Sequence, residues 1–331
     1  MDTTDNKTQI SKLDELWDSV VDYRSSKHFY EVMKACARLR HLAPYNAMLV
    51  ELQRPGAHYV LTAKQWRDQY HRVIKPNARP MLILVPFGPV GFVFDIGDTM
   101  TDPADTRLFK PSDDDILNRI AEPFKTRNDV PKKVLNNLLE NLPIHGIHLD
   151  TKFDVGASFG AQIELGDDLG SIHMDIGSNG QVSWKASYLI SVNKNASPGQ
   201  SFASICHELG HLFCHHLPMP KDWNERKWEV RHLEHRWREF EAESVAWLVC
   251  ERLGVEKTSE DYLASYLEDG MRQDTIHESV SIEQILKATY EVERTLAPMR
   301  YSEGLLYKHC RAFKDFCKEH KDKMGTLSYM K

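Results

Sequence analysis

No long hydrophobic run is present in this sequence, and it begins without the features of a secretory signal. None of its 331 residues lies in an uninterrupted apolar stretch near the roughly 18 residues that a membrane-spanning helix needs. The first residues, MDTTDNKTQISKLDELWD, are polar and acidic, whereas a signal peptide starts with basic residues and an apolar core. The sequence therefore predicts a cytoplasmic protein that has no membrane partner.

Cysteine is scarce, and its positions argue against a framework of disulfides. The six cysteines form no CxxC pair, and Cys206, Cys214 and Cys250 lie in apolar stretches of helical character. In a chain of this length such cysteines are typical of reduced, buried thiols in an intracellular protein.

An excess of positive charge is also missing, which argues against a protein coated in nucleic acid. Lys and Arg number 42 and Asp and Glu number 48, so the net charge is 42 − 48 = −6. One local exception lies near Trp66 and Tyr70, where only Asp68 opposes a basic cluster. The basic cluster comprises Lys64, Arg67, His71, Arg72, Lys75 and Arg79. Single-stranded DNA could stack on the rings and place phosphates on the cations, or the segment could be a solvated helix face with Trp66 in the core.

The spacing of apolar residues predicts an α+β protein of about two domains, at roughly 150 residues each. Helices are expected over 9–40, 44–53, 113–126 and 132–142, and strands over 80–86, 91–95, 157–165, 171–174 and 182–192. Residues 100–112 are expected to be a loop, and nearly all of the chain after Ser197 to be helical. The interruption at 126–132 predicts an N-terminal α+β domain, residues 1–128, and a second domain, residues 129–331, with a small sheet and a helical C-terminal extension.

A metal-binding motif lies in the helix expected to start after Ser197. Ser197 is a favoured N-cap residue, and Pro198 is favoured at the first helical position. His207 and His211 lie one turn apart on one face of this helix, where both imidazoles can bind one tetrahedral Zn²⁺. Glu208, next to the first ligand, can take a proton from the attacking water and pass it to a leaving amine. For so short a motif, the alternative is an amphipathic helix with two surface histidines.

A third ligand is expected from the next strong helical segment, residues 239–253. Glu239 and Glu243 lie one turn apart on the same stripe of that helix, which favours a division of roles. We expect Glu239 to bind the metal and Glu243 to accept the free N–H of a ligating imidazole. The reverse assignment is the chief alternative, followed by Glu241, His232 and His235.

Candidates for contacts with a peptide substrate flank the motif. The strand expected over residues 187–193 could hold an extended peptide by β-addition. His215 continues the ligand face by one more turn and is either a substrate-site residue or a histidine at the rim. Tyr188, His215 and His232 are conceivable donors to an oxyanion, and the sequence does not rank them. The predicted activity is hydrolysis of peptide bonds in a peptide or a cytosolic protein.

The segment His207-Glu-Leu-Gly-His211, followed by Glu239-Phe-Glu-Ala-Glu243, resembles the ImmA/IrrE family of metallo-endopeptidases. Members of that family pair a HELGH-like helix with a later helix that donates a glutamate. The resemblance implies a zincin-like metallopeptidase domain in which His207, His211 and Glu239 bind Zn²⁺ and Glu208 is the base. It also implies that the substrate is a regulatory protein. A regulator that uses the peptidase fold only to bind a partner is a further hypothesis.

The N-terminal part of the chain carries a second resemblance, to the ArdC-type antirestriction proteins. It rests on Tyr45-Asn-Ala-Met-Leu-Val, Gln53-Arg-Pro, Thr62-Ala-Lys-Gln-Trp66 and Val93-Phe-Asp-Ile-Gly-Asp-Thr99. Those proteins carry a single-stranded-DNA-binding domain before a zinc peptidase-like domain. The resemblance implies that residues 1–128 form an ArdC-like domain that binds single-stranded DNA, in which case the zinc would be structural or vestigial.

Overall fold

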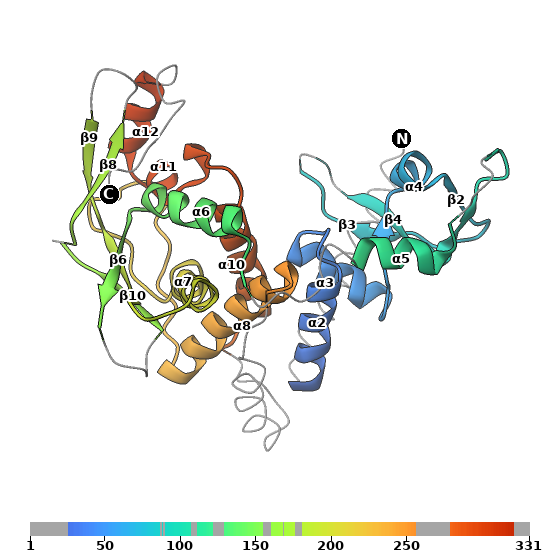
Figure 1. The fold of residues 1–331 in the computed structure, drawn as a ribbon, viewed down its shortest axis with the longest axis horizontal. Helices are drawn as coiled ribbons and strands as arrows, with labels where there is room; N and C mark the ends of the chain where they lie inside the picture. Colours follow the sequence, from blue (N-terminus) through green and yellow to red (C-terminus); the bar gives the residue numbers. More distant parts are fainter. Residues whose placement is uncertain are drawn as a thin grey trace. The chain divides into compact units, whose positions relative to one another are not determined.

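The computed structural model describes residues 26–86, 88, 90–106, 111–121, 129–154, 160–167, 169–175, 181–255 and 279–320. Both helices and short strands occur in this part of the chain (Figure 1), which confirms the expected α+β class. The described residues divide into two compact units. The first unit contains those from 26 to 121 and residues 251–254, and the second unit contains the others. That residues 1–128 and 129–331 are separate folding domains stays a prediction.

The first unit combines helices with short antiparallel strands. Its elements are α2 (Ser26–Arg38), α3 (Pro44–Gln53), β1 (Val60–Leu61), α4 (Ala63–Tyr70), β2 (Arg72–Ile74), β3 (Met81–Ile83), β4 (Gly91–Asp95), β5 (Thr99–Thr101) and α5 (Asp113–Ala121). β4 pairs with β1 on one side and with β3 on the other. The helix over 44–53 and the two strands on either side of residues 84–90 are confirmed. The part of the helical region 9–40 that precedes residue 26 lies outside the described residues.

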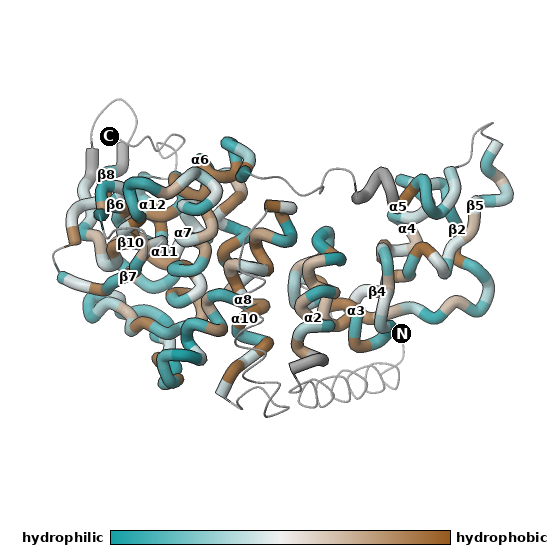
Figure 2. The backbone as a smooth tube through the Cα atoms, turned by 60° about the horizontal axis from the view of Figure 1, so that its bottom comes forward, coloured by the Kyte–Doolittle hydropathy of each residue, from teal (hydrophilic) through white to brown (hydrophobic). Residues whose placement is uncertain are grey.

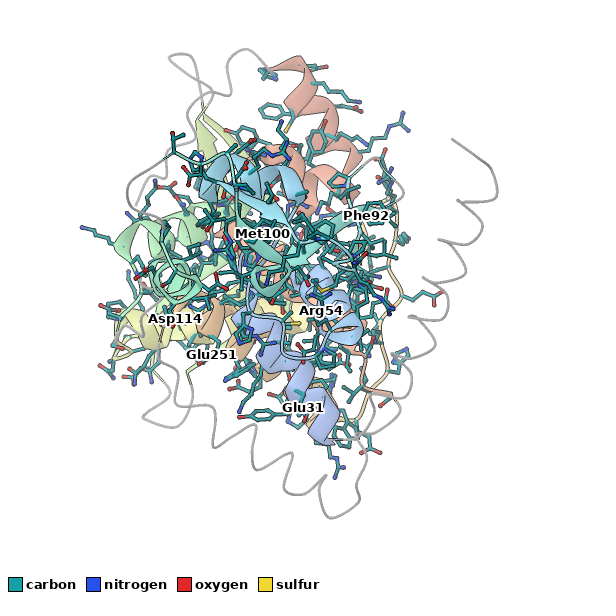
Figure 3. The ribbon with its side chains drawn as sticks, turned by 90° about the vertical axis from the view of Figure 1, so that its right-hand side faces the viewer. Glu31, Arg54, Phe92, Met100, Asp114 and Glu251 are labelled. Carbon is teal, nitrogen blue, oxygen red and sulfur yellow. The ribbon has the colours of Figure 1, made fainter. Side chains whose placement is uncertain are left out.

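Strand β5 contradicts the loop expected over 100–112. It pairs antiparallel with β2, so that Met100 lies opposite Val73. Three residues are too few to show the alternation from which strands are predicted, and the pairing depends on a partner distant in the sequence. The ribbon is reinforced by Arg72, whose Nε atom donates to Thr99 Oγ1 at 2.6 Å. Met100 itself and Phe92 of β4, both labelled in Figure 3, remain exposed.

The second unit holds a three-stranded sheet and the helices that follow it. Its elements are α6 (Lys132–Asn141), β6 (Ile147–Phe153), β7 (Ala161–Leu165), β8 (Ser171–Asp175), β9 (Gln181–Lys185), β10 (Tyr188–Asn193), α7 (Pro198–Phe213), α8 (His235–Leu253), α10 (Ile282–Thr295), α11 (Leu305–His309) and α12 (Arg311–Glu319). β8 and β9 form a separate antiparallel pair. β10 leads into α7, as the sequence indicates, whereas the turn residues 177–180 lie outside the described part.

Strand β10 occupies the centre of the three-stranded sheet. It is parallel to β6 on one side and antiparallel to β7 on the other. Both rows of its backbone N–H and C=O groups are therefore used within the sheet. The expectation that residues 187–193 bind a peptide by β-addition is wrong for this reason, and the two edges of this sheet belong to β6 and β7.

The chain between α7 and α8 corrects the expectation of an almost entirely helical C-terminal part. Residues 215–234 form turns and irregular backbone. Pro218 and Pro220 disfavour a helix, and His215 and Arg226 adopt φ values of 61° and 48°, outside the helical region. Irregular connections of this length are uncommon in compact domains and are often functional.

All six cysteines are buried and none forms a disulfide, as expected. Cys206 and Cys250 lie within α7 and α8, where a thiol behaves as a small apolar side chain. Among the described residues, no helix combines the length and the apolar character that crossing a membrane requires.

Helices α7 and α8 approach each other until their backbones touch. α7 buries an apolar face that includes Ile205 and Leu209, and every residue of α8 from 241 to 250 is buried. Figure 2 shows the hydrophobic residues that run along these helices. At Gly210, an added Cβ atom would lie 2.9 Å from both the Cα and the carbonyl oxygen of Ala242. The close approach therefore requires glycine at this position of α7.

We predict that Gly210→Ala destabilises the protein. Alanine usually stabilises a helix relative to glycine by about 1 kcal/mol. Here the added methyl group meets backbone atoms that cannot rotate away, and overpacking of this kind costs about 1–3 kcal/mol. Urea unfolding followed by circular dichroism measures the change, and an unchanged or higher midpoint would contradict the packing described for the two helices.

Candidate metal centre

The helix that carries the two histidines begins where its sequence predicts. Ser197 Oγ accepts the N–H of Gln200, the Gln200 side chain accepts the N–H of Ser197, and Pro198 occupies the first helical position. This cap fixes the start of α7, and burial of its apolar face fixes the rotation of the helix. α7 lies beside α8 (Figure 1). His207 and His211 consequently contact Glu239 in the first turns of α8.

Two imidazoles of α7 and one carboxylate of α8 converge on a single point. His207 Nε2 and His211 Nε2 lie 3.2 Å apart. Glu239 Oε2 lies 3.3 Å from His207 Nε2, and Glu239 Oε1 lies 3.4 Å from His211 Nε2. These three residues are thus brought together, with one ligand atom from each within 4.8 Å of the others.

The outer nitrogens of the two imidazoles are occupied by other partners. His207 Nδ1 lies 2.9 Å from Glu243 Oε2, and His211 Nδ1 lies 3.0 Å from His216 Nδ1. A carboxylate can only accept, so His207 donates through Nδ1 and its Nε2 lone pair is directed at the point of convergence when the ring is neutral. Glu243 therefore holds the orientation of His207, in the manner of a carboxylate behind a metal-binding histidine.

The spacing of the two inner nitrogens and the Glu239 oxygens fits a small divalent cation. Ligands bound about 2.0–2.1 Å from a tetrahedral Zn²⁺ lie about 3.3 Å from one another. The two imidazole nitrogens lie 3.2 Å apart, and each lies 3.3 or 3.4 Å from a different oxygen of Glu239, which agrees with that value. Two imidazoles and one carboxylate form a donor set that leaves a fourth position open, as in catalytic rather than structural zinc sites.

The charges around the site favour a cation strongly. Burial by itself lowers the pKa of His207, but the hydrogen bonds to Glu239 and Glu243 outweigh it and raise the pKa to about 9. Burial by itself raises the pKa of Glu239, but its contacts with His207 and His211 hold the pKa well below the usual range. Without a metal, Glu239 and Glu243 thus stabilise a proton on His207. A divalent cation bound to His207 would replace this proton.

Glu208 stands beside the three candidate ligands and is not part of their group. Its side chain is buried, and burial raises its pKa, although the neighbouring charges of His207 and His211 act in the opposite direction. The backbone N–H of Ile163 in strand β7 hydrogen-bonds to the carboxylate. The position predicted for a base is therefore occupied by a desolvated carboxylate next to the edge strand.

The other candidates for the third ligand are placed differently. Glu241 is fully buried and directs its oxygens at His216 and Arg231. His235 lies at the rim, with Nδ1 3.4 Å from Glu239 Oε1 and 78% of its side chain exposed. His232 is exposed and is not in the group of converging ligand atoms. The geometry thus favours Glu239, and metal binding by this set stays a proposal.

Two residues expected near the substrate, Tyr188 and His215, make contacts with other parts of the protein instead. Tyr188 is fully buried, and its hydroxyl donates to the carbonyl of Pro218 at 3.0 Å, so it is not free to stabilise an oxyanion. α7 ends at Phe213, so His215 does not continue the ligand face. Its ring stacks on Trp228, with ring centroids 5.1 Å apart.

His216 is the site residue that the sequence did not reveal. Its ring reaches the outer nitrogen of His211 from a position beyond the end of the helix. Helical periodicity cannot predict such a contact, because the left-handed backbone of His215 reverses the chain in between. The only signal was the presence of two further histidines directly after the motif helix.

The structure revises the basic cluster of the first unit. Trp66 is fully buried and its indole N–H donates to the carbonyl of Phe94 at 2.8 Å, so its ring is not available for stacking on bases. Arg72 is also buried, bound to Thr99 and to Asp113. The other five basic residues of the cluster remain exposed: Lys64, Arg67, His71, Lys75 and Arg79.

Comparison with known proteins finds the two resemblances suggested by the motifs. Residues 172–246 match the family model of the IrrE N-terminal-like domain, a peptidase family, and this match includes α7 and the first turns of α8. Two solved structures are similar to the chain, both of the antirestriction ArdC protein from the R388 plasmid. The Mn(II)-bound one is 12% identical with a TM-score of 0.34, and the metal-free one is 11% identical with a TM-score of 0.35. Each of the two alignments covers 77% of this chain and 85% of the ArdC chain. None of the curated proteins matches the sequence.

We predict that Glu239→Gln lowers the affinity for Zn²⁺ more than Glu243→Gln does. The first change removes a charged ligand, whereas the second removes only the acceptor behind His207. Loss of such an outer partner typically costs about tenfold to a hundredfold in affinity. Competition with a chromophoric chelator measures both dissociation constants.

Glu229→Gln supplies the matched control, because Glu229 is exposed in the irregular segment and lies outside the cluster. Its affinity should equal that of the unmodified protein. A larger loss in Glu243→Gln than in Glu239→Gln would reverse the assignment of the two glutamates.

Proposed function

We propose that the second unit is a zinc metallopeptidase domain of the HExxH, zincin-like type that hydrolyses peptide bonds. The observation that carries this proposal is the convergence of three lone-pair donors, from His207, His211 and Glu239, beside a buried carboxylate that is not a ligand, Glu208. The match of residues 172–246 to a peptidase family supports the same assignment.

The proposed reaction divides the work between the metal ligands and Glu208. His207, His211 and Glu239 would hold the ion, which when bound would supply polarisation of the scissile carbonyl and a more acidic water molecule. Glu208 removes the proton of the attacking water and delivers it to the leaving amine. Since burial raises the pKa of Glu208, its carboxylate is a stronger base than one in water and is better matched to neutral pH.

Strand β7 is the proposed site for the substrate backbone. Among the described strands β7 pairs only with β10, so its other edge can add an extended peptide. Ile163 of β7 contacts the Glu208 carboxylate, so a peptide aligned on this strand passes close to the base. An extended segment of a protein is therefore a better substrate than a folded helix or a small amide.

The test of the proposed base is Glu208→Gln. Glutamine preserves the shape of the side chain but cannot accept the proton, so cleavage of a quenched fluorescent peptide library should fall by at least about a hundredfold. Zinc content, measured by atomic emission on the purified full chain, should stay at that of the unmodified protein because Glu208 is not a ligand.

Glu283→Gln is the control, since Glu283 belongs to an ion pair with Lys287 on α10. It should cleave the library as the unmodified protein does. Full activity of Glu208→Gln would rule out its role as the base, and absence of cleavage by the zinc-loaded, unmodified protein would favour a fold used only for binding.

The exposed part of the basic cluster favours a second candidate function, binding of single-stranded DNA by the first unit. Five basic side chains between residues 64 and 79 face solvent, and only Asp68 opposes them in that segment. With Trp66 in the core, the cations rather than an aromatic platform would provide the contacts. Such binding depends on the phosphates and weakens steeply with salt.

For this candidate we predict that the double variant Lys64→Glu, Arg67→Glu weakens binding of a labelled oligothymidine. Fluorescence anisotropy over a salt series should give a slope smaller by about one for each phosphate contact that is lost. The control is Lys227→Glu, which changes an exposed lysine of the other unit. Binding that is absent, or insensitive to salt, rejects the candidate.

A further inference from the structure

After α7 the chain turns back and brings His216 against the helix. His215 adopts a left-handed conformation with φ of 61°, its N–H donates to Leu212 O at 3.1 Å, and the His216 N–H donates to His211 O at 2.9 Å. These two bonds define the Schellman type of helix end, in which the left-handed position usually holds glycine. The turn places the His216 and His211 rings with centroids 5.2 Å apart.

A chain of hydrogen bonds between buried side chains leads from His211 to His216 and on to Glu241. His211 Nδ1 lies 3.0 Å from His216 Nδ1, and His216 Nε2 lies 2.9 Å from Glu241 Oε2. The side chains of His216 and Glu241 are 1% and 0% exposed. Arg231 pairs with both oxygens of Glu241, and the N–H of Ser281 donates to Oε1 at 2.8 Å. Every polar atom of this chain of hydrogen bonds is therefore satisfied within the protein rather than by solvent.

The direction of each hydrogen bond follows from Glu241. Its carboxylate can only accept, so His216 carries its proton on Nε2 and offers the lone pair of Nδ1. His211 must then donate through Nδ1, which leaves the lone pair of its Nε2 directed at the point of convergence. The arrangement selects one tautomer of His211, as Glu243 does directly for His207.

We propose that His216 and Glu241 are positioning residues that hold His211 as the second metal ligand. The inference rests on the proposed function of the site. The two ligands of α7 are thus supported differently: His207 by one carboxylate, and His211 by an imidazole that is itself backed by a carboxylate. Arg231 keeps Glu241 charged and in place, which ties the irregular segment between α7 and α8 to the geometry of the metal centre.

A different interpretation of the same atoms is a second, buried metal site. Cys214, His216 and Glu241 offer ligand atoms within 4.8 Å of one another. The guanidinium of Arg231 already occupies the carboxylate, and a cation placed there would meet its positive charge. Both ring nitrogens of His216 are also engaged, so no lone pair is left for a metal. The positioning role accounts for all of these contacts.

The experiment compares His216→Leu and His216→Asn in the full chain, with Co²⁺ and Zn²⁺ as probes. Leucine removes both hydrogen bonds, and the affinity for either metal should fall about tenfold to a hundredfold. The Asn side-chain oxygen can accept from His211 at the position of Nδ1, so this variant should recover part of the loss. The visible spectrum of bound Co²⁺ should broaden or shift in His216→Leu, because the orientation of one ligand is no longer fixed.

The matched control is His145→Asn, which replaces another buried histidine of the same unit, one that accepts the N–H of Leu305 and contacts no ligand. It should lose stability while keeping the metal affinity and the Co²⁺ spectrum. Thermal unfolding of the metal-free proteins separates loss of folding from loss of affinity, and the comparison uses variants folded at the assay temperature.

Three results would overturn the proposal. Unchanged affinity and an unchanged Co²⁺ spectrum in a folded His216→Leu protein would remove the positioning role and leave the proposed peptidase intact. Failure of the unmodified chain to bind either metal would remove both. Binding of a second equivalent that disappears in Cys214→Ala would show that the cluster is itself a metal site.

Discussion

The contact between Gly210 of α7 and Ala242 of α8 sets the distance on which the candidate metal centre depends. A glutamate side chain is short, and both Glu239 and Glu243 of α8 must reach imidazoles of the other helix. Glu239 contacts the inner nitrogens of both histidines, and Glu243 contacts the outer nitrogen of His207. Wider separation of the helices would move both carboxylates away together. The close packing of the two backbones is therefore also the condition for the contacts between the glutamates and the imidazoles.

Part of this site could be predicted because it is periodic. His207 and His211 are one turn apart on one helix, and Glu239 and Glu243 are one turn apart on another, so sequence spacing alone indicates which side chains share a face. The start of α7 could also be predicted, since Ser197 and Pro198 form a local signal for the N-terminus of a helix. What spacing could not decide is which glutamate meets the inner atoms, because that depends on where along their lengths the two helices cross.

The remainder of the site depends on contacts that no local pattern encodes. His216 reaches His211 only because His215, a residue that seldom adopts positive φ, reverses the chain. Arg231 and Glu241 meet across an irregular segment that was expected to be helical despite Pro218 and Pro220. The prediction that β10 binds a peptide is wrong because it, too, depends on contacts that no local pattern encodes. An apolar run predicts a strand, but its place at the centre or at the edge of a sheet is a property of the whole topology.

The excess of negative charge around the two imidazoles explains why this cluster favours binding of a cation. Glu208, Glu239 and Glu243 lie around two imidazoles, whereas Glu241, the fourth carboxylate nearby, is already neutralised by Arg231. In the metal-free protein a proton on His207 compensates part of this negative charge, with a pKa of about 9. A divalent ion must displace that proton, so below this pH binding competes with protonation and strengthens as the pH rises. The network behind His211 works in the same sense, because it directs the lone pair of the second imidazole inward.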